Sequence, residues 1–301
     1  MANQVDARLV VAPVPSRTRA VRTLRRFRRA PIIPLIILIM FVVVGVGASW
    51  IAPYDPNQTS LRDRHLPPAW LEGGDTDHIF GTDHLGRDVY SRVIHGARIS
   101  LIVASMVILA GNTIGVLIGL VSGWYGGWVD EFFMRLVDIK LAIPTILLAL
   151  VLVLALGQTF ILIVGVLAIT IWPRIARNVR GEVLQLKNMD YVALARVAGA
   201  STPRILAVHI FPGVVNTLTV LTTLEVGIVI LLESTLSFLG AGVPADIPAW
   251  GTMVSDGRAQ IAVAWWTSTM PGLAILVVVM AANLFGDWLR DTLDPKLRQL
   301  A

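Results

Sequence analysis

Six long apolar segments alternate with polar ones along this chain. The apolar segments cover about residues 31–52, 99–121, 136–156, 161–175, 213–239 and 266–285. As an α-helix, about twenty residues at about 1.5 Å each cross the roughly 30 Å hydrocarbon core of a bilayer. The pattern therefore predicts an all-α membrane protein with six transmembrane helices, the third of them kinked at Pro144.

The polar segments divide the chain around these helices. We expect a basic arm at 1–30, the first helix at 31–52, an external loop at 53–96, a core of five transmembrane helices at 97–289 and a tail at 290–301. Within the core, 188–212 is expected as a surface segment and 241–265 as a second external loop. A basic arm before an apolar run also resembles a signal peptide, but the length of the run favours a retained helix.

Composition and charge support a membrane protein and suggest its orientation. Of the 301 residues, 55% are hydrophobic and only 15% are charged, which is outside the range of soluble globular domains. Most of the 25 Lys and Arg residues lie in segments expected on one side of the bilayer. Because basic loops stay inside, we expect both termini to be cytoplasmic and do not interpret the net charge of +5 as nucleic-acid binding. Membrane lipid is the expected surrounding.

The pattern of residues 188–212 predicts two short helices on the membrane surface. Apolar side chains recur there at helical spacing, at Tyr191, Leu194, Ala195 and Ala198. Asp190 complements the positive end of the first helix dipole, and Gly199 provides a left-handed stop after it. Thr202 is predicted to cap a second helix, with Pro203 as its first residue.

A stripe of glycines in the second apolar segment predicts close helix packing. The four glycines lie at four-residue steps, at Gly111, Gly115, Gly119 and Gly123. Small residues let helices in a bilayer approach closely and gain dispersion contacts. We expect this face to contact another helix of the same chain, with contact to a second subunit as the alternative.

Polar side chains in the fifth apolar segment predict a functional helix. These candidates for the lining of a translocation path are Asn216, Thr219, Thr223, Glu225 and Glu233. A carboxylate at mid-bilayer costs on the order of 2.5 to 3.5 kcal/mol on insertion scales, so each should face a polar interior or a partner group. Internal hydrogen bonding between helices is the equally weighted alternative.

The chain carries no motif for chemistry of its own. It has no G-x-x-x-x-G-K-[ST] phosphate loop, no H-E-x-x-H and no G-x-S-x-G elbow, and it has no cysteine. One polar cluster could suggest a metal site, namely Asp75, Asp77, His78, Asp83 and His84. Its spacing fits neither a calcium loop nor an i, i+4 histidine pair. We therefore expect no catalytic residue, no metal and no cofactor bound by this chain.

Four stretches resemble the permease subunits of bacterial ATP-binding-cassette importers, in the branch that carries dipeptides, oligopeptides or nickel. They are FGTDHLGRDVYSRVIHGARISL (80–101), DYVALARVAGAS with HIFP (190–212), LLESTLSFLGAGVPADIPAWGTMVSDGR (231–258) and NLFGDWLRDTLDPKLR (283–298). In the family the second stretch carries a Glu-Ala-Ala triplet, then Gly, then a terminal Leu-Pro. Gly199 and Pro212 match that order, whereas Ala193 replaces the glutamate. The chain is most similar to a dipeptide permease.

The resemblance implies a non-enzymatic transport subunit of the bacterial plasma membrane. Its implied partners are a second homologous permease, two ATP-binding subunits that hold ATP and Mg, and an extracytoplasmic substrate-binding protein. It also implies a cytoplasmic coupling helix between transmembrane helices 4 and 5, formed by Asp190, Tyr191, Leu194, Ala195, Arg196, Gly199, Ala200 and Ser201. Because Ala193 lacks a carboxylate, we expect docking there to depend on shape and apolar contact.

Two alternatives remain for the function. Within the same branch, nickel or glutathione could replace di- and oligopeptides as the substrate. In a different class, the chain could be a self-sufficient channel or proton-coupled carrier with ion sites at Glu225 and Glu233.

Overall fold

The computed structural model describes residues 31–293, and the regular secondary structure of this part of the chain is helical, with no strand beyond one isolated bridge. The predicted basic arm and nearly all of the predicted tail lie outside these residues. The helices are α2 (Ile32–Ile51), α3 (Val89–Tyr125), α4 (Gly127–Ala142), α5 (Thr145–Leu156), α6 (Phe160–Leu186), α7 (Asp190–Val197), α8 (Thr202–Arg204), α9 (Phe211–Phe238), α10 (Trp250–Arg258) and α11 (Trp266–Leu293), with a 3₁₀ turn η1 (Leu61–Asp63) and a π-helix η2 (Ile205–Ile210).

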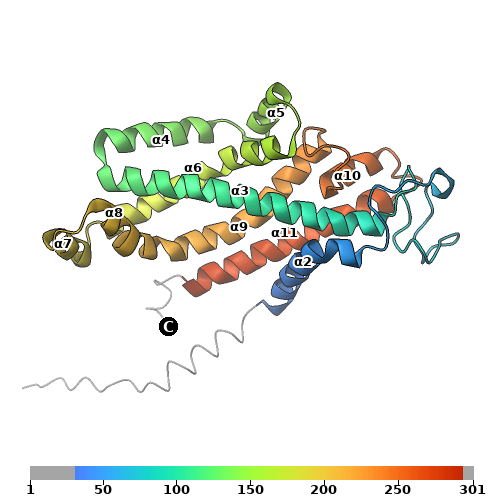
Figure 1. Ribbon diagram of the computed structural model, residues 1–301, viewed down its shortest axis with the longest axis horizontal. Helices are drawn as coiled ribbons and strands as arrows, with labels where there is room; N and C mark the ends of the chain where they lie inside the picture. Colours follow the sequence, from blue (N-terminus) through green and yellow to red (C-terminus); the bar gives the residue numbers. More distant parts are fainter. Residues whose placement is uncertain (1–30, 294–301) are drawn as a thin grey trace, which may run out of the picture.

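The long helices form one elongated bundle with a different short helix at each end (Figure 1). Helices α3, α6, α9 and α11 run along its length, while α2 packs against α3 and α11. Helix α7 lies at one end of the bundle, and α10 lies at the other beside residues 53–88. We call these the α7 end and the α10 end.

Within residues 31–293, five helices are long and apolar enough to cross a membrane, so the prediction of an all-α membrane protein is confirmed. The third predicted span, 136–156, is instead divided between α4 and α5, which meet at an angle of 91°. Pro144 causes the break because it disfavours helical geometry at the residue before it, and Ile143 is extended, with φ −91° and ψ 127°. The pair counts as a sixth crossing only if it is taken as one broken span.

The structure differs from the predicted segments at three places. Helix α3 begins at Val89, inside the predicted loop 53–96, because the Asp88 carboxylate caps it by accepting a hydrogen bond from Ser91 N at 2.7 Å. The predicted loop 241–265 contains α10. Ser201, not Thr202, occupies the N-cap position of α8, and it makes no side-chain cap bond. The helix then continues through η2 into α9.

The predicted glycine stripe lies along the contact between α3 and α6 (Figure 1). A Cβ atom at Gly111 would lie 2.4 Å from Ile171 Cγ1, and one at Gly115 would lie 2.7 Å from Ile175 Cβ. The same holds for Gly119 against Val179, also at 2.7 Å. Gly123 meets Val183 at 2.8 Å. Because these approaches leave no room for a side chain, the stripe serves packing within this subunit, as preferred from the sequence.

Polar contacts attach α4 to α6. The Arg180 guanidinium pairs with Asp130, and Arg177 pairs with Asp138. The buried Lys140 ammonium donates a hydrogen bond to the carbonyl oxygen of Thr170. Asp130, Asp138 and Lys140 of α4 are therefore bound to α6 inside the chain.

Candidate functional site

Helix α7 presents two different faces. Val192 is completely buried and Ala195 is nearly so, and both belong to an apolar cluster with residues of α6, η2 and α9. Leu194 is 68% exposed and Val197 is 88% exposed, and Tyr191 is also exposed. These three residues are spaced i, i+3, i+6, so they form one outward apolar stripe. We call Tyr191, Leu194 and Val197 the α7 stripe.

The structure divides the residues that were predicted as the apolar face of α7. Tyr191, Leu194 and Ala198 are exposed, whereas Ala195 faces the bundle. The other residues that the resemblance implied are placed around them: Asp190 is the first residue of α7, Arg196 lies in its last turn, Ala200 is half-buried and Ser201 precedes α8. Ala193, where the family has glutamate, is exposed.

Few polar contacts hold α7 in place. Gly199, with φ +77°, ends the helix, and the next amide, Ala200 N, donates back to Ala195 O at 3.0 Å. The Arg196 guanidinium carbon lies 4.4 Å from the centre of the Trp124 ring at the end of α3. The attachment of α7 to the rest of the bundle thus depends on a small apolar contact and one cation–π pair.

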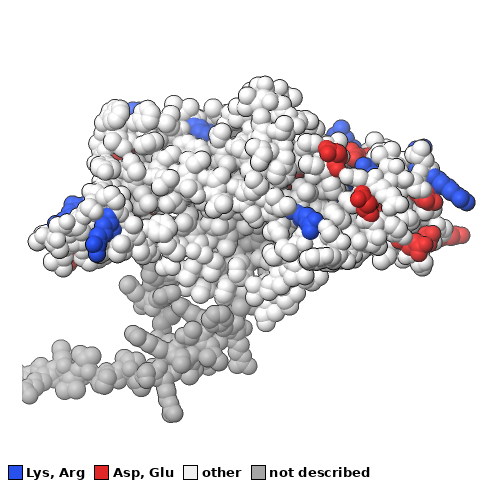
Figure 2. Space-filling view, in the orientation of Figure 1, with Lys and Arg blue, Asp and Glu red and all other residues white. Residues whose placement is uncertain are grey.

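Charge differs between the two ends of the bundle. Figure 2 shows Lys and Arg side chains over α7 and α8, and a mixture of acidic and basic side chains over the α10 end. Between them the visible surface is nearly free of charge. This distribution is typical of a protein that spans a bilayer along its long axis.

The candidate path residues on α9 do not share one face. Asn216 and Thr219 are exposed and Thr223 is half-buried, and they form an outward polar stripe at i, i+3, i+7. We call these three residues the α9 stripe. By contrast, Glu225 and Glu233 are buried inside the subunit. A shared lining formed by all five side chains is therefore not present in this conformation.

The two buried carboxylates have different surroundings. Glu233 accepts a hydrogen bond from Ser237 Oγ at 2.7 Å, while Ser234 Oγ lies 3.4 Å away. Glu225 has no hydrogen-bond partner within residues 31–293. One turn before it, Thr222 Oγ1 accepts a hydrogen bond from Asn112 Nδ2 of α3 at 2.8 Å. Glu233 thus fits internal hydrogen bonding, and Glu225 lies next to a polar contact between α3 and α9.

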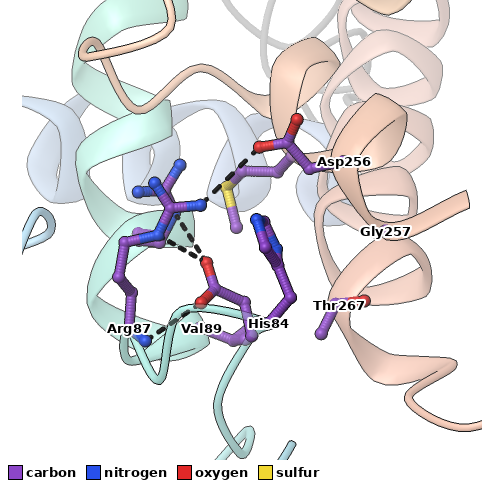
Figure 3. A pocket seen from close by; sticks show the side chains of 9 residues that line it. His84, Arg87, Val89, Asp256, Gly257 and Thr267 are labelled. Carbon is purple, nitrogen blue, oxygen red and sulfur yellow. Dashed lines mark hydrogen bonds and ion pairs between the residues drawn. The ribbon is translucent and has the colours of Figure 1, made fainter. Parts of the chain in front are cut away.

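A buried ionic cluster at the α10 end was missed from the sequence (Figure 3). The Asp83 carboxylate accepts a hydrogen bond from Arg87 Nε at 2.6 Å and lies 3.9 Å from Arg92 Nε. Arg87 also reaches Asp256 of α10, with 3.6 Å between Nη2 and Oδ2. The four-residue spacing of Asp83 and Arg87 was a visible signal, but the contact to α10 depends on tertiary structure.

These contacts give a structural role to part of the Asp and His cluster that resembled a metal site. Asp83 is committed to the arginines, and His78 Nδ1 lies 3.0 Å from the capping carboxylate of Asp88. Within the described residues no group of three or more His, Cys, Asp or Glu side chains could hold a metal ion.

Two tryptophans, one on α10 and one at the start of α11, hold the α10 end together. Trp250 Nε1 donates to Val93 O of α3 at 2.8 Å, and its ring lies where a Cβ atom on Gly96 would collide with it. Trp266 Nε1 donates to Thr82 O at 3.0 Å. Both indoles are buried with their polar atom satisfied, which makes this end of the molecule tightly built.

Comparison with known proteins identifies the family. A family described as binding-protein-dependent transport system inner membrane component matches residues 115–299, and the N-terminal transmembrane domain of oligopeptide transport permease C matches residues 18–68. The di/tripeptide transport system permease protein DppC of Pseudomonas aeruginosa is 44% identical over 263 residues, which cover 87% of this chain and 86% of that protein. The dipeptide transport system permease proteins DppC of Haemophilus influenzae and Escherichia coli are 41% and 43% identical, each over 85% of this chain and over 87% and 85% of their own lengths. The chain therefore belongs to the inner membrane components of binding-protein-dependent transport systems, as a multi-pass permease subunit.

Proposed function

We propose that this subunit forms, with a second homologous permease, the pathway by which di- or oligopeptides cross the plasma membrane. Its similar proteins are named for the transport of di/tripeptides and dipeptides, and they match it over most of its length. Nickel or glutathione is the alternative substrate within the same branch. A substrate-binding protein outside the membrane delivers the peptide.

The proposed topology has six crossings, with α4 and α5 together forming the broken third one. Both termini and α7 are then cytoplasmic, and α10 with residues 53–88 is external. The basic surface over α7 and α8 in Figure 2 supports this orientation, because positively charged segments are retained inside.

The observation that carries the mechanism is the exposed α7 stripe on a helix whose other face is buried. Exposed apolar side chains on a helix outside the bilayer indicate a protein contact. We assign this contact to one of two separate ATP-binding subunits, which hold ATP and Mg and supply the energy. Closure of those subunits then moves α7, and α7 moves the transmembrane helices.

The α9 stripe of Asn216, Thr219 and Thr223 supplies the proposed lining of the path. Polar side chains that face lipid are unfavourable, so the stripe should face the second permease or the peptide. The hydroxyls of Thr219 and Thr223 already donate to carbonyl oxygens of their own helix, at 2.7 Å each. Because their donors are already satisfied, these hydroxyls offer a mildly polar surface that does not require one particular ligand.

The test replaces Leu194 by Asp in the complete importer reconstituted in liposomes. A carboxylate in the centre of the α7 stripe should remove apolar contact and lower ATP-dependent peptide uptake about tenfold or more, since interface anchors are worth about 2 kcal/mol or more. Gln185→Glu is the control, because it adds the same charge at an exposed position of α6 outside the stripe. Full uptake by the Leu194→Asp importer would contradict the coupling role of α7.

A second experiment separates the importer from a self-sufficient carrier. Liposomes that contain this chain alone should show no peptide uptake under a proton gradient. If uptake occurs without the ATP-binding subunits, and Glu225→Gln abolishes it, the carrier alternative is correct.

A further inference from the structure

The π-helix η2 (Ile205–Ile210) joins the segment that contacts α7 to the transmembrane helix α9. Here Phe211 N donates to Leu206 O, five residues earlier, instead of four as in an α-helix. Each hydrogen-bonded turn of η2 therefore spans one residue more than a turn of the α-helix that follows. The π-helix is rare, occurs mostly as single turns inside α-helices and is frequently found at functional sites.

Pro212 gives a physical reason for the wide turn. It has no N–H to donate to Val208 O four residues earlier, and in a regular α-helix its ring would collide with that carbonyl group. A π-helical turn before the proline moves the carbonyl away without ending the helix. Pro203, in contrast, lies in the first turn of α8, where no N–H is needed.

The side chains of η2 connect it mechanically to α7. Ile205 is 1% exposed and Ile210 is completely buried, and both belong to the apolar cluster that contains Val192 and Ala195 of α7. Because η2 lies between α7 and α9 in the chain and packs against α7, a displacement of α7 acts on η2 directly. The number of residues per turn in η2 then determines how α9 is rotated.

We propose that Pro212 is a positioning residue for transport, which keeps η2 π-helical and so sets the rotation of α9 relative to α7. Each residue of an α-helix turns the chain by about 100° and raises it by about 1.5 Å. If η2 became α-helical, its extra residue would become part of the regular helical winding. The α9 stripe would then turn by about 100° around the helix axis relative to α7. This inference rests on the proposed coupling role of α7.

The experiment compares Pro212→Ala with the matched control Pro203→Ala in the complete importer. Alanine at position 212 restores the missing donor, so η2 should become α-helical and uptake should fall about tenfold, while the ATP-binding subunits still co-purify. Pro203→Ala should keep wild-type uptake, because its position tolerates any good helix former. Full uptake by the Pro212→Ala importer would overturn the proposal.

The absence of cysteine from this chain allows the rotation of α9 to be measured directly. Val214 is completely buried and Val215 is exposed, and they are neighbours at the start of α9. With the native proline, a maleimide should label Val215→Cys and not Val214→Cys. With Pro212→Ala, Val214→Cys should become reactive. Lost uptake with an unchanged labelling pattern would show that Pro212 does not set the rotation.

A deletion keeps the proposal testable if Pro212→Ala prevents assembly. Removing Ala207, which is exposed, takes the extra residue out of η2 and leaves the proline in place. The deletion should lower uptake about as much as Pro212→Ala does, and wild-type uptake would overturn the proposal. The two failures can be told apart. If the coupling role of α7 is wrong, the Leu194→Asp importer keeps its uptake. If only the role of Pro212 is wrong, Leu194→Asp still lowers uptake, whereas the changes in η2 do not.

Discussion

The α10 end and the α7 end of this permease are built in opposite ways. At the α10 end, the buried Trp250 holds α10 against α3, the buried Trp266 holds the start of α11 against Thr82, and a buried ionic cluster is centred on Asp83. At the α7 end, a helix of eight residues is held by two small buried side chains, Val192 and Ala195, and by one cation–π pair. Its remaining apolar side chains face outward.

This contrast fits the different tasks proposed for the two ends. Segments with few buried contacts open at a low cost in free energy. Densely packed segments open only when a large part of the fold unfolds with them. The α7 end can therefore follow a partner that changes shape, and the α10 end can hold α3, α9 and α11 together during that movement. The glycine stripe fixes the second half of α3, which ends beside α7, closely to α6.

The largest effect should come from Trp250→Ala at the α10 end. Truncating this fully buried indole removes its apolar contacts and its hydrogen bond to Val93 O, so the free energy of unfolding should fall by about 3 to 5 kcal/mol. Chemical unfolding in detergent measures the change. Trp50→Ala, at an 85% exposed position on α2, is the matched control and should change it little. A small loss at Trp250 would remove the contrast between the ends.

Asp83→Asn should have the next largest effect. The substitution removes the negative charge between Arg87 and Arg92, and both guanidinium groups are buried. Breaking such a cluster should lower the free energy of unfolding by about 3 kcal/mol, measured in the same way. Glu72→Gln removes an exposed charge from the same segment between α2 and α3 and should be nearly neutral. Equal effects of the two variants would show that the cluster does not stabilise this end.

Arg196→Gln should have the smallest effect, at the α7 end. It removes the cation–π contact with Trp124, which is worth about 0.5 to 1 kcal/mol at an exposed site. Proteolysis of the α7 segment should become faster, while the unfolding of the whole chain should hardly change. Arg204→Gln, on the same basic surface, serves as the control. If Arg196→Gln lowered global stability as much as Asp83→Asn does, the α7 end would be no looser than the α10 end.

Hydrophobic patterning predicted the membrane class and most of the helices because a bilayer demands long apolar runs whatever their neighbours are. Local signals also sufficed at α7, where helical spacing and Gly199 marked its extent. Boundaries failed where a polar side chain satisfied a helix end inside an expected loop, as Asp88 does for α3. The sequence predicted the position of the bend at Pro144, but it did not predict that the two helices meet at an angle as large as 91°.

Candidate sites were harder to predict, because periodicity gives the face of a helix but not what covers it. Ala195 and Leu194 are neighbours in one predicted apolar face, yet one is buried and the other is exposed. The carboxylates of α9 looked alike in the sequence, whereas only Glu233 has hydrogen-bond donors, from Ser237 and Ser234. The contact between Arg87 and Asp256 joins residues far apart in the chain, and no local pattern encodes it.

The sequence by itself determined that this chain crosses a membrane by helices, that it carries the signatures of a permease family and that a short surface helix ends at Gly199. These properties depend on composition and on interactions between residues close in the chain. Only the tertiary structure decided which face of α7 stays open and that α10 closes the opposite end. Burial and long-range pairing settle these features, since they depend on which helices come to lie side by side.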